Sequence, residues 1–161
     1  MKTLSLLLLL ALALPSAYSQ TFFKSDYYRF GLTTPLNYTL ITDSGLPYLS
    51  TSYNGNSIRV TRNVQQHNGT IEQMNAVSNQ DLAAHLVIGN SYITGKGLVV
   101  DGYKFLFAHY VNTINGIPMK FTSYVYLFGK TEYILTFSGA TDSFNNDANM
   151  FDAVRNTFRV Y

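Results

Sequence analysis

Residues 103–138 alternate large apolar and polar side chains with the two-residue period of β-strands. In the first run Phe105, Phe107 and His109 share one face, while Leu106 and Ala108 lie on the other. Two further runs, at 120–128 and 131–138, alternate in the same way and are rich in aromatic and β-branched residues. Because both faces carry large apolar groups, we expect a sheet that is covered on both sides.

Two turn signals join these three runs. Asn115-Gly116 suits a hairpin turn with positive φ at both central residues, although Pro118 suggests a longer or irregular loop. Gly129-Lys130 suits a type II′ turn, which places Gly at the first central position. The pattern therefore predicts an antiparallel meander.

Shorter strands are predicted before the meander. The first covers 27–32 and ends at Pro35, because proline cannot donate to a strand ladder. After a loop at 36–47, strands at 48–52 and 57–64 are joined by the hairpin signal Asn54-Gly55. A strand at 92–100 is interrupted by Gly95-Lys96-Gly97, which indicates a turn or a bulge.

Two segments show helical spacing. Ser78 can cap a helix at 79–88, with Asp81 in its first turn and Gly89 as its stop. Thr70 with Gln73 forms a second possible capping box, which leaves an earlier start open. An amphipathic helix at 144–157 presents an edge of phenylalanines to the sheet. The last three residues can add a final half-strand.

These elements predict an α+β domain at 20–161, in which two helices cover an antiparallel meander. The tail, comprising residues 133–138, Phe144 and 151–160, resembles the closing strand and helix of the PsbP-like superfamily. That superfamily includes a photosynthetic oxygen-evolving accessory protein, a Ran-binding nuclear import factor and bacterial exported proteins of the DcrB type. The resemblance implies an αβα sandwich and a non-enzymatic accessory role, and it transfers no catalytic residue. A cystatin-like fold and a small β-barrel also fit the pattern.

The first 19 residues predict a secretory signal peptide. Lys2 precedes an apolar run at 4–14, and Ala17-Tyr18-Ser19 offers small residues for cleavage before Gln20. The run is too short to span a bilayer comfortably, so we expect a secreted or periplasmic protein without stable membrane insertion.

The chain contains no Cys, so it has no disulfides, which fits a bacterial exported protein. Asn37 and Asn68 begin triplets of the N-glycosylation pattern, and the sequence leaves open whether they are modified.

Composition excludes several function classes. The formal net charge is only +2, and no Lys/Arg cluster forms the basic stripe that nucleic-acid binding requires. The absence of Cys excludes a thiol nucleophile, and the three histidines lack metal-ligand spacing. No G-x-S-x-G motif or complete phosphate loop occurs. We therefore expect no nucleic-acid partner, no metal, no cofactor and no catalytic residue.

Four residues are candidates for a ligand or partner surface. His109 could act as a base with Asp101 or Glu132, but a strand histidine bonded to a neighbouring hydroxyl is the favoured interpretation. Tyr124 and Tyr126 share a face by alternation and would form a binding surface if that face is incompletely covered. The side on which Tyr110 lies depends on the strand register, which the sequence does not fix.

The leading hypothesis is an exported accessory or binding protein that acts through protein contacts and without chemistry. Two alternatives stay open: a carrier of a small apolar ligand held between the sheet and the helix at 144–157, and a small enzyme with an acid–base site around His109.

Overall fold

The computed structural model describes residues 20–35, 39–41, 48–53, 55–64, 68–86 and 91–161. The expected signal peptide, Asn37, Asn54 and Gly89 lie outside the described residues. Asn68 is exposed immediately before a helix. Among the described residues, no helix is both long and apolar enough to cross a membrane.

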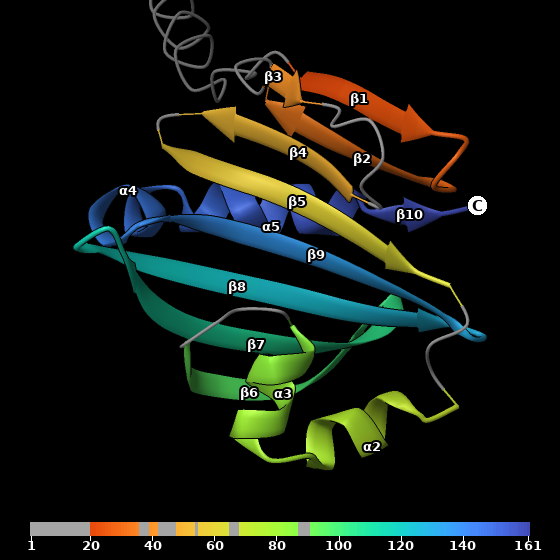
Figure 1. Cartoon of the computed structure of the whole chain (residues 1–161). Helices are drawn as coiled ribbons and strands as arrows, with labels where there is room; N and C mark the ends of the chain where they lie inside the picture. The colour runs from red at the N-terminus through yellow and green to blue at the C-terminus, as the bar shows by residue number, and fades with distance from the viewer. Residues whose placement is uncertain (1–19, 36–38, 42–47, 54, 65–67, 87–90) are drawn as a thin grey trace, which may run out of the picture.

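A seven-stranded antiparallel sheet forms the centre of the molecule (Figure 1). Its strand order is β3-β4-β5-β9-β8-β7-β6, and a smaller sheet has the order β1-β2-β10. The strands of the large sheet are β3 (Thr39–Ile41), β4 (Tyr48–Tyr53), β5 (Asn56–Asn63), β6 (Tyr92–Asp101), β7 (Tyr103–Ile114), β8 (Ile117–Phe128) and β9 (Thr131–Ala140). Those of the smaller sheet are β1 (Gln20–Ser25), β2 (Phe30–Pro35) and β10 (Arg159–Val160).

The predicted meander of β7, β8 and β9 is confirmed. Asn115 and Gly116 both have positive φ, at 52° and 77°, and Ile114 pairs directly with Ile117. The longer loop suggested by Pro118 is therefore wrong, since that proline lies within β8. Gly129 has a φ of 62°, as a type II′ turn requires at its first central position.

The N-terminal strand differs from its prediction. It begins at Phe30 and runs to Pro35, while residues 20–25 form the unexpected strand β1. Strand β10 pairs only with Phe30 and Gly31 of β2, so the missing N–H of Pro35 removes no ladder bond on that side. Tyr27 and Tyr28 lie in the turn before β2.

The helix predicted at 79–88 is found as α3 (Asn79–His85), the possible earlier start forms a separate helix α2 (Ile71–Ala76), and the predicted C-terminal helix is divided in two. The Thr70–Gln73 capping box starts α2, and Ser78 caps α3. The C-terminal helix is interrupted at Asp147, which separates α4 (Thr141–Asn146) from α5 (Ala148–Thr157). The buried amide of Asn56 donates to the carbonyl of Ser143 and to the Asp147 carboxylate, which holds this interruption against β5.

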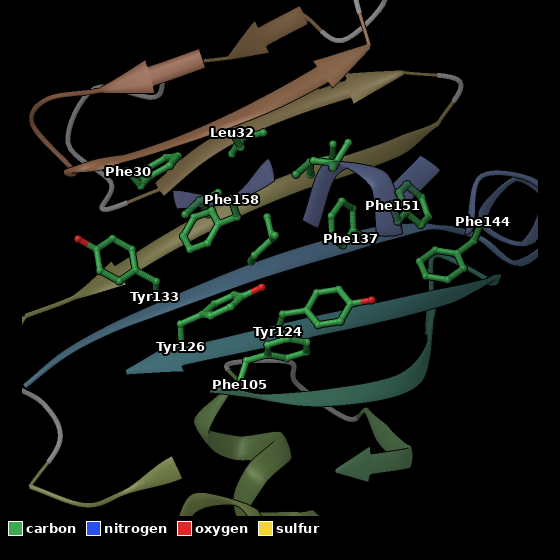
Figure 2. Packing of buried hydrophobic residues seen from close by; sticks show 14 residues of the cluster. Phe30, Leu32, Phe105, Tyr124, Tyr126, Tyr133, Phe137, Phe144, Phe151 and Phe158 are labelled. Carbon is green, nitrogen blue, oxygen red and sulfur yellow. The ribbon is translucent and has the colours of Figure 1, made fainter. Parts of the chain in front are cut away.

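The helices cover opposite faces of the large sheet, and the fold is therefore the predicted α+β sandwich (Figure 1). Helices α4 and α5 pack on a core rich in aromatic rings, in which the ring of Phe151 lies 4.8 Å from that of Phe137 on β9. Figure 2 shows this row of rings, which continues through Phe158 to Phe30 of β2. Helices α2 and α3 cover a second, more aliphatic core over β6 and β7.

The alternation predicted for the meander is confirmed. Phe105, Tyr124 and Tyr126 face α5, whereas Leu106 and Val125 belong to the core beneath α2 and α3. Strand β6 is continuous through its glycines, and a bulge between Ile93 and Gly95 adjusts its register to β7.

Candidate functional site

On the face of the large sheet that α5 covers, an open groove lies over the outer strands that this helix does not reach. Helix α5 packs over β9 and lies behind β5 and β9 in Figure 1, whereas β6 and β7 extend beyond it. We call this hollow of about 350 Å³ the α5 groove. It is lined by Val99, Phe105, Phe107, His109, Thr122, Tyr124, Phe144, Ala148, Phe151, Asp152 and Arg155.

The floor of the α5 groove is aromatic. The rings of Phe105 and Tyr124 meet edge to face, with their centres 5.6 Å apart (Figure 2). The ring centres of Phe107 and His109 are 5.0 Å apart. On the adjacent strand β6, a Cβ at Gly97 would lie 2.8 Å from the ring of Phe107. Glycine therefore permits this ring to extend over β6 toward the edge of the sheet.

Arg155 supplies the positive charge of the groove wall. Its guanidinium lies 5.1 Å from the ring centre of Phe105 and 5.5 Å from that of Tyr124, and its side chain is only 14% exposed. The carboxylates of Asp101 and Asp152 lie 3.5 and 3.7 Å from its nitrogens. The rings and carboxylates hold the guanidinium in one place, which suits it to orient a bound group.

Two tyrosine hydroxyls add polar atoms to this region. The Tyr124 hydroxyl donates to Asp152 at 3.3 Å, and burial raises its pKa to about 12. Burial likewise raises the pKa of Tyr126, which lines a second hollow of about 450 Å³. The two hollows share Phe105 and Arg155. Both hydroxyls stay protonated at neutral pH and can serve only as neutral hydrogen-bonding groups.

His109 lies at the rim of the groove, and its placement fits the favoured interpretation. Its Nδ1 is 2.8 Å from the hydroxyl of Thr122 on β8. The packing of the ring against its neighbours lowers its pKa, and the charge of Asp152 opposes this shift only in part. The imidazole is therefore neutral at neutral pH.

Neither carboxylate proposed as a partner for His109 reaches it. Asp101 is opposite Tyr103, and His109 lies six residues further along β7, a separation of about 20 Å at 3.3 Å per residue. Glu132 is fully buried and is bonded to His85 Nε2 and to Asn63, both at 2.7 Å. The hypothesised pairing of His109 with Asp101 or Glu132 is wrong.

Tyr110 does not join the other two candidate tyrosines. It belongs to the core under α2 and α3, where its ring stacks on Phe121 at 4.9 Å. Its hydroxyl contacts Ser123, whose hydroxyl in turn contacts Thr136. Burial raises the pKa of Tyr110 to about 12. The strand register thus places Tyr110 on the face opposite Tyr124 and Tyr126, and no common surface contains all three.

Sequence reasoning missed Asp152 and Arg155 as site residues. Their i,i+3 spacing on the predicted helix was a usable signal, since it places both side chains on one helical face. Their position above β7 and β8 depends on where α5 crosses the sheet, which the sequence does not determine. Among the residues that the structure describes, no group of three or more His, Asp and Glu side chains could hold a metal ion.

Comparison with known proteins identifies the fold. No protein-family model and no curated protein sequence matches the chain. Among solved structures, cyanobacterial PsbP (CyanoP) from Synechocystis sp. PCC 6803 matches with a TM-score of 0.69 at 12% identity, covering 92% of this chain and 98% of that one. The chain has the PsbP-like fold.

Two further structures show how widely this fold is used. The Saccharomyces cerevisiae Ran-binding protein Mog1p matches with a TM-score of 0.60 at 8% identity, covering 89% of this chain and 96% of that one. LpqN of Mycobacterium tuberculosis, involved in cell envelope biogenesis, matches with a TM-score of 0.60 at 9% identity, covering 88% and 90%. At such low identities the likeness establishes the PsbP-like fold alone.

Proposed function

We propose that this protein is an exported accessory protein that binds a protein partner in the α5 groove and performs no chemistry on it. The observation that carries the proposal is the aromatic floor of the groove, which lies beside a guanidinium held in place by rings and carboxylates. Aromatic and arginine side chains are the groups that contribute most to binding energy at protein interfaces.

The position of the groove favours a protein partner over an enclosed apolar ligand. Between α5 and β9 the space is filled by rings, with Phe151 4.8 Å from Phe137 and 4.9 Å from Phe144. The hollow lies at the edge of this packing, and its lining includes the polar side chains of Asp152, Arg155 and Tyr124. A carrier of apolar molecules would instead hold its ligand inside an apolar cavity. A partner that lies across the open groove suits this geometry better.

Export belongs to the same proposal. It rests on the sequence of residues 1–19, with a short basic start, an apolar run and small residues before Gln20. Among the solved structures with this fold are the cyanobacterial PsbP and LpqN, the latter involved in cell envelope biogenesis. Peptide mass mapping of protein recovered outside the cytoplasm should give an N-terminal peptide that begins at Gln20 or at its pyroglutamate form, and protein that retains Met1 in the cytoplasm would contradict export.

Site-specific photo-crosslinking in the native host tests the binding site. Replacing Phe107 by p-benzoylphenylalanine keeps an aromatic group on the groove floor, where we expect a crosslink to one discrete polypeptide. The matched control places the same residue at Tyr27, which is 82% exposed in the turn between β1 and β2. Crosslinks of equal yield from both positions, or none from Phe107, would contradict a binding site in the groove.

A further inference from the structure

Strand β6 forms an edge of the seven-stranded sheet, and this edge borders the α5 groove. On the side away from β7, its backbone N–H and C=O groups pair with no strand among the described residues. Val99 of β6 lines the groove, so the edge and the groove form one continuous surface. An unpaired strand edge accepts one kind of chain, an extended polypeptide segment.

Only part of this edge is open to pairing. A bulge lies between Ile93 and Gly95, and Lys96 carries a charge. Because bulges and charged side chains both disfavour the pairing of a further strand, the first half of β6 is not open to pairing. At the other end Gly102, with a φ of 70°, turns the chain into β7. Between these limits lies the uncharged stretch 97–100.

Apolar groups flank this stretch on both faces. On the groove face, the ring of Phe107 extends over Gly97 beside Val99. On the opposite face, Leu98 and Val100 are 37% and 74% exposed. A segment added to β6 would therefore bury apolar side chains on both of its own faces.

A second copy of this chain does not complement the groove. If two β6 strands paired antiparallel about Val99, the partner strand would bring Gly97, Val99 and Asp101 to the groove face. These side chains are absent, small or charged, so the rings of the floor would remain uncovered. The groove instead requires a large apolar side chain next to the edge.

We infer that an extended, uncharged segment of another polypeptide adds to β6 as an eighth strand and inserts an aromatic or large aliphatic side chain against Phe107. This inference rests on the proposed function and specifies how the partner is held. Backbone hydrogen bonds to 97–100 supply affinity, and the inserted side chain supplies selectivity.

Titration of short peptides into the purified, isotope-labelled protein tests this inference by NMR. The probes are four capped heptapeptides, Lys-Thr-Val-X-Val-Thr-Lys, in which the central residue X is Phe, Tyr, Trp or Leu. Matched controls carry Ala at X, or Pro in place of one flanking valine and the adjacent threonine. The N–H groups of these two neighbours point to opposite edges of the strand, so the change removes a donor to the ladder in either register. At about 1 mM peptide, sites with millimolar affinity are detected.

We expect the aromatic probes to shift the amide signals of Gly97 to Val100 and to slow their exchange with solvent. The Ala and Pro controls should bind at least about tenfold more weakly. Val100→Lys should weaken binding by a similar factor. Because Val100 is exposed, lysine at this position should leave the fold intact, but its charge would lie next to an apolar side chain of the added segment. The control Val64→Lys, at an exposed site just beyond β5, should leave binding unchanged.

The remaining outcomes separate this inference from the proposed function. Shifts confined to Phe107, His109 and Arg155, with the β6 amides unchanged and the Pro control still bound, would overturn strand addition while supporting a groove that binds side chains. An absence of shifts with all four probes would overturn the strand addition, and the crosslinking from Phe107 would then decide the proposed function separately.

Discussion

The two faces of the large sheet each leave an area that no described helix covers, and these areas differ in chemistry. Over β6 and β7, on the α5 side, the residues of the α5 groove that stay at least partly exposed include Phe107, His109 and Arg155. Over β5 and β9, on the α2–α3 side, they are hydroxyls and Arg59, and there the hydroxyl of Ser57 contacts that of Ser138 at 2.6 Å.

This contrast separates a solvated surface from a candidate binding site. Hydroxyls that bond one another across strands need no further partner, and they leave a polar face that water can cover. The half-buried ring of Phe107 at the open groove remains partly in contact with water, which favours its burial by a partner. The offset of the two helical layers thus gives one sheet a solvated area and a candidate binding area on different faces.

Truncation of the core beneath α5 should give the largest effect. Phe151→Ala removes a ring that packs between Phe137 and Phe144, and we expect it to lower the free energy of unfolding by about 4 kcal/mol. Leu82→Ala, on the buried face of α3, should lower the free energy of unfolding by about 3 kcal/mol. Urea unfolding measures both, and only Phe151→Ala should shift the NMR signals of the groove. Equal shifts of these signals in both variants would contradict the separation of the faces.

A glycine on the α5 face should give the next effect. A Cβ at Gly139 would lie 1.7 Å from Oδ1 of Asn56, the residue that anchors the α4–α5 interruption. We expect Gly139→Ala to lower the free energy of unfolding by about 2 kcal/mol, since the displaced amide is buried. Gly95→Ala is the control, because its Cβ would meet His109 at an ordinary 3.7 Å. Similar melting temperatures for both variants would refute this reason.

The hydroxyl network of the opposite face should contribute less. Tyr110→Phe removes the hydroxyl that contacts Ser123 inside the core, with an expected loss of about 1 kcal/mol. Tyr103→Phe, at the half-buried first residue of β7 on the other face, should change stability by less than about 0.5 kcal/mol. Equal losses in urea unfolding would show that the network does not stabilise its face.

The pKa values of the two described histidines should be shifted in opposite directions from the ordinary value. The carboxylate of Glu132 raises the pKa of His85, whereas partial burial lowers that of His109. A histidine NMR titration, assigned with His85→Gln and His109→Gln, should give a midpoint above 6.5 for His85 and below 6.5 for His109. Midpoints in the reverse order would contradict the assigned environments.

The same shifts set the pH dependence of stability. Because the folded pKa of His85 is raised, its contribution is fully present below about pH 6.5 and is lost as the pH rises through the folded value. His85→Gln should therefore lower the free energy of unfolding more at pH 5.5 than at pH 8, and urea unfolding at the two pH values measures this difference. Burial of His109 acts with the opposite sign and lowers stability below about pH 6.5.

The sequence predicted the parts of the fold that depend on local pattern. Alternation assigned Phe105 and Phe107 to one face of their strand and Leu106 to the other, and Asn115-Gly116 indicated the central hairpin. It did not place Tyr110 relative to Tyr124, because that requires the register between β7 and β8. Strand β1 was missed because its residues are mostly exposed and lack a clear apolar alternation.

The site was less predictable than the fold for a physical reason. Asp152 and Arg155 lie 45 or more positions from Phe107 along the chain, and only the crossing of α5 over the sheet brings them to the same groove. The break at Asp147, which sets that crossing, depends on the buried Asn56 of β5. A pairing between such distant elements leaves no spacing motif in the sequence.

Native mass spectrometry of the protein recovered from its own host tests the central claim most directly. Wild-type protein and the control Val64→Ala should carry the mass of one associated polypeptide, and Phe107→Ala, confirmed as folded by circular dichroism, should lose it. A polypeptide retained equally by Phe107→Ala, or a reproducible extra mass of small-molecule size instead, would contradict binding of a protein partner in the α5 groove.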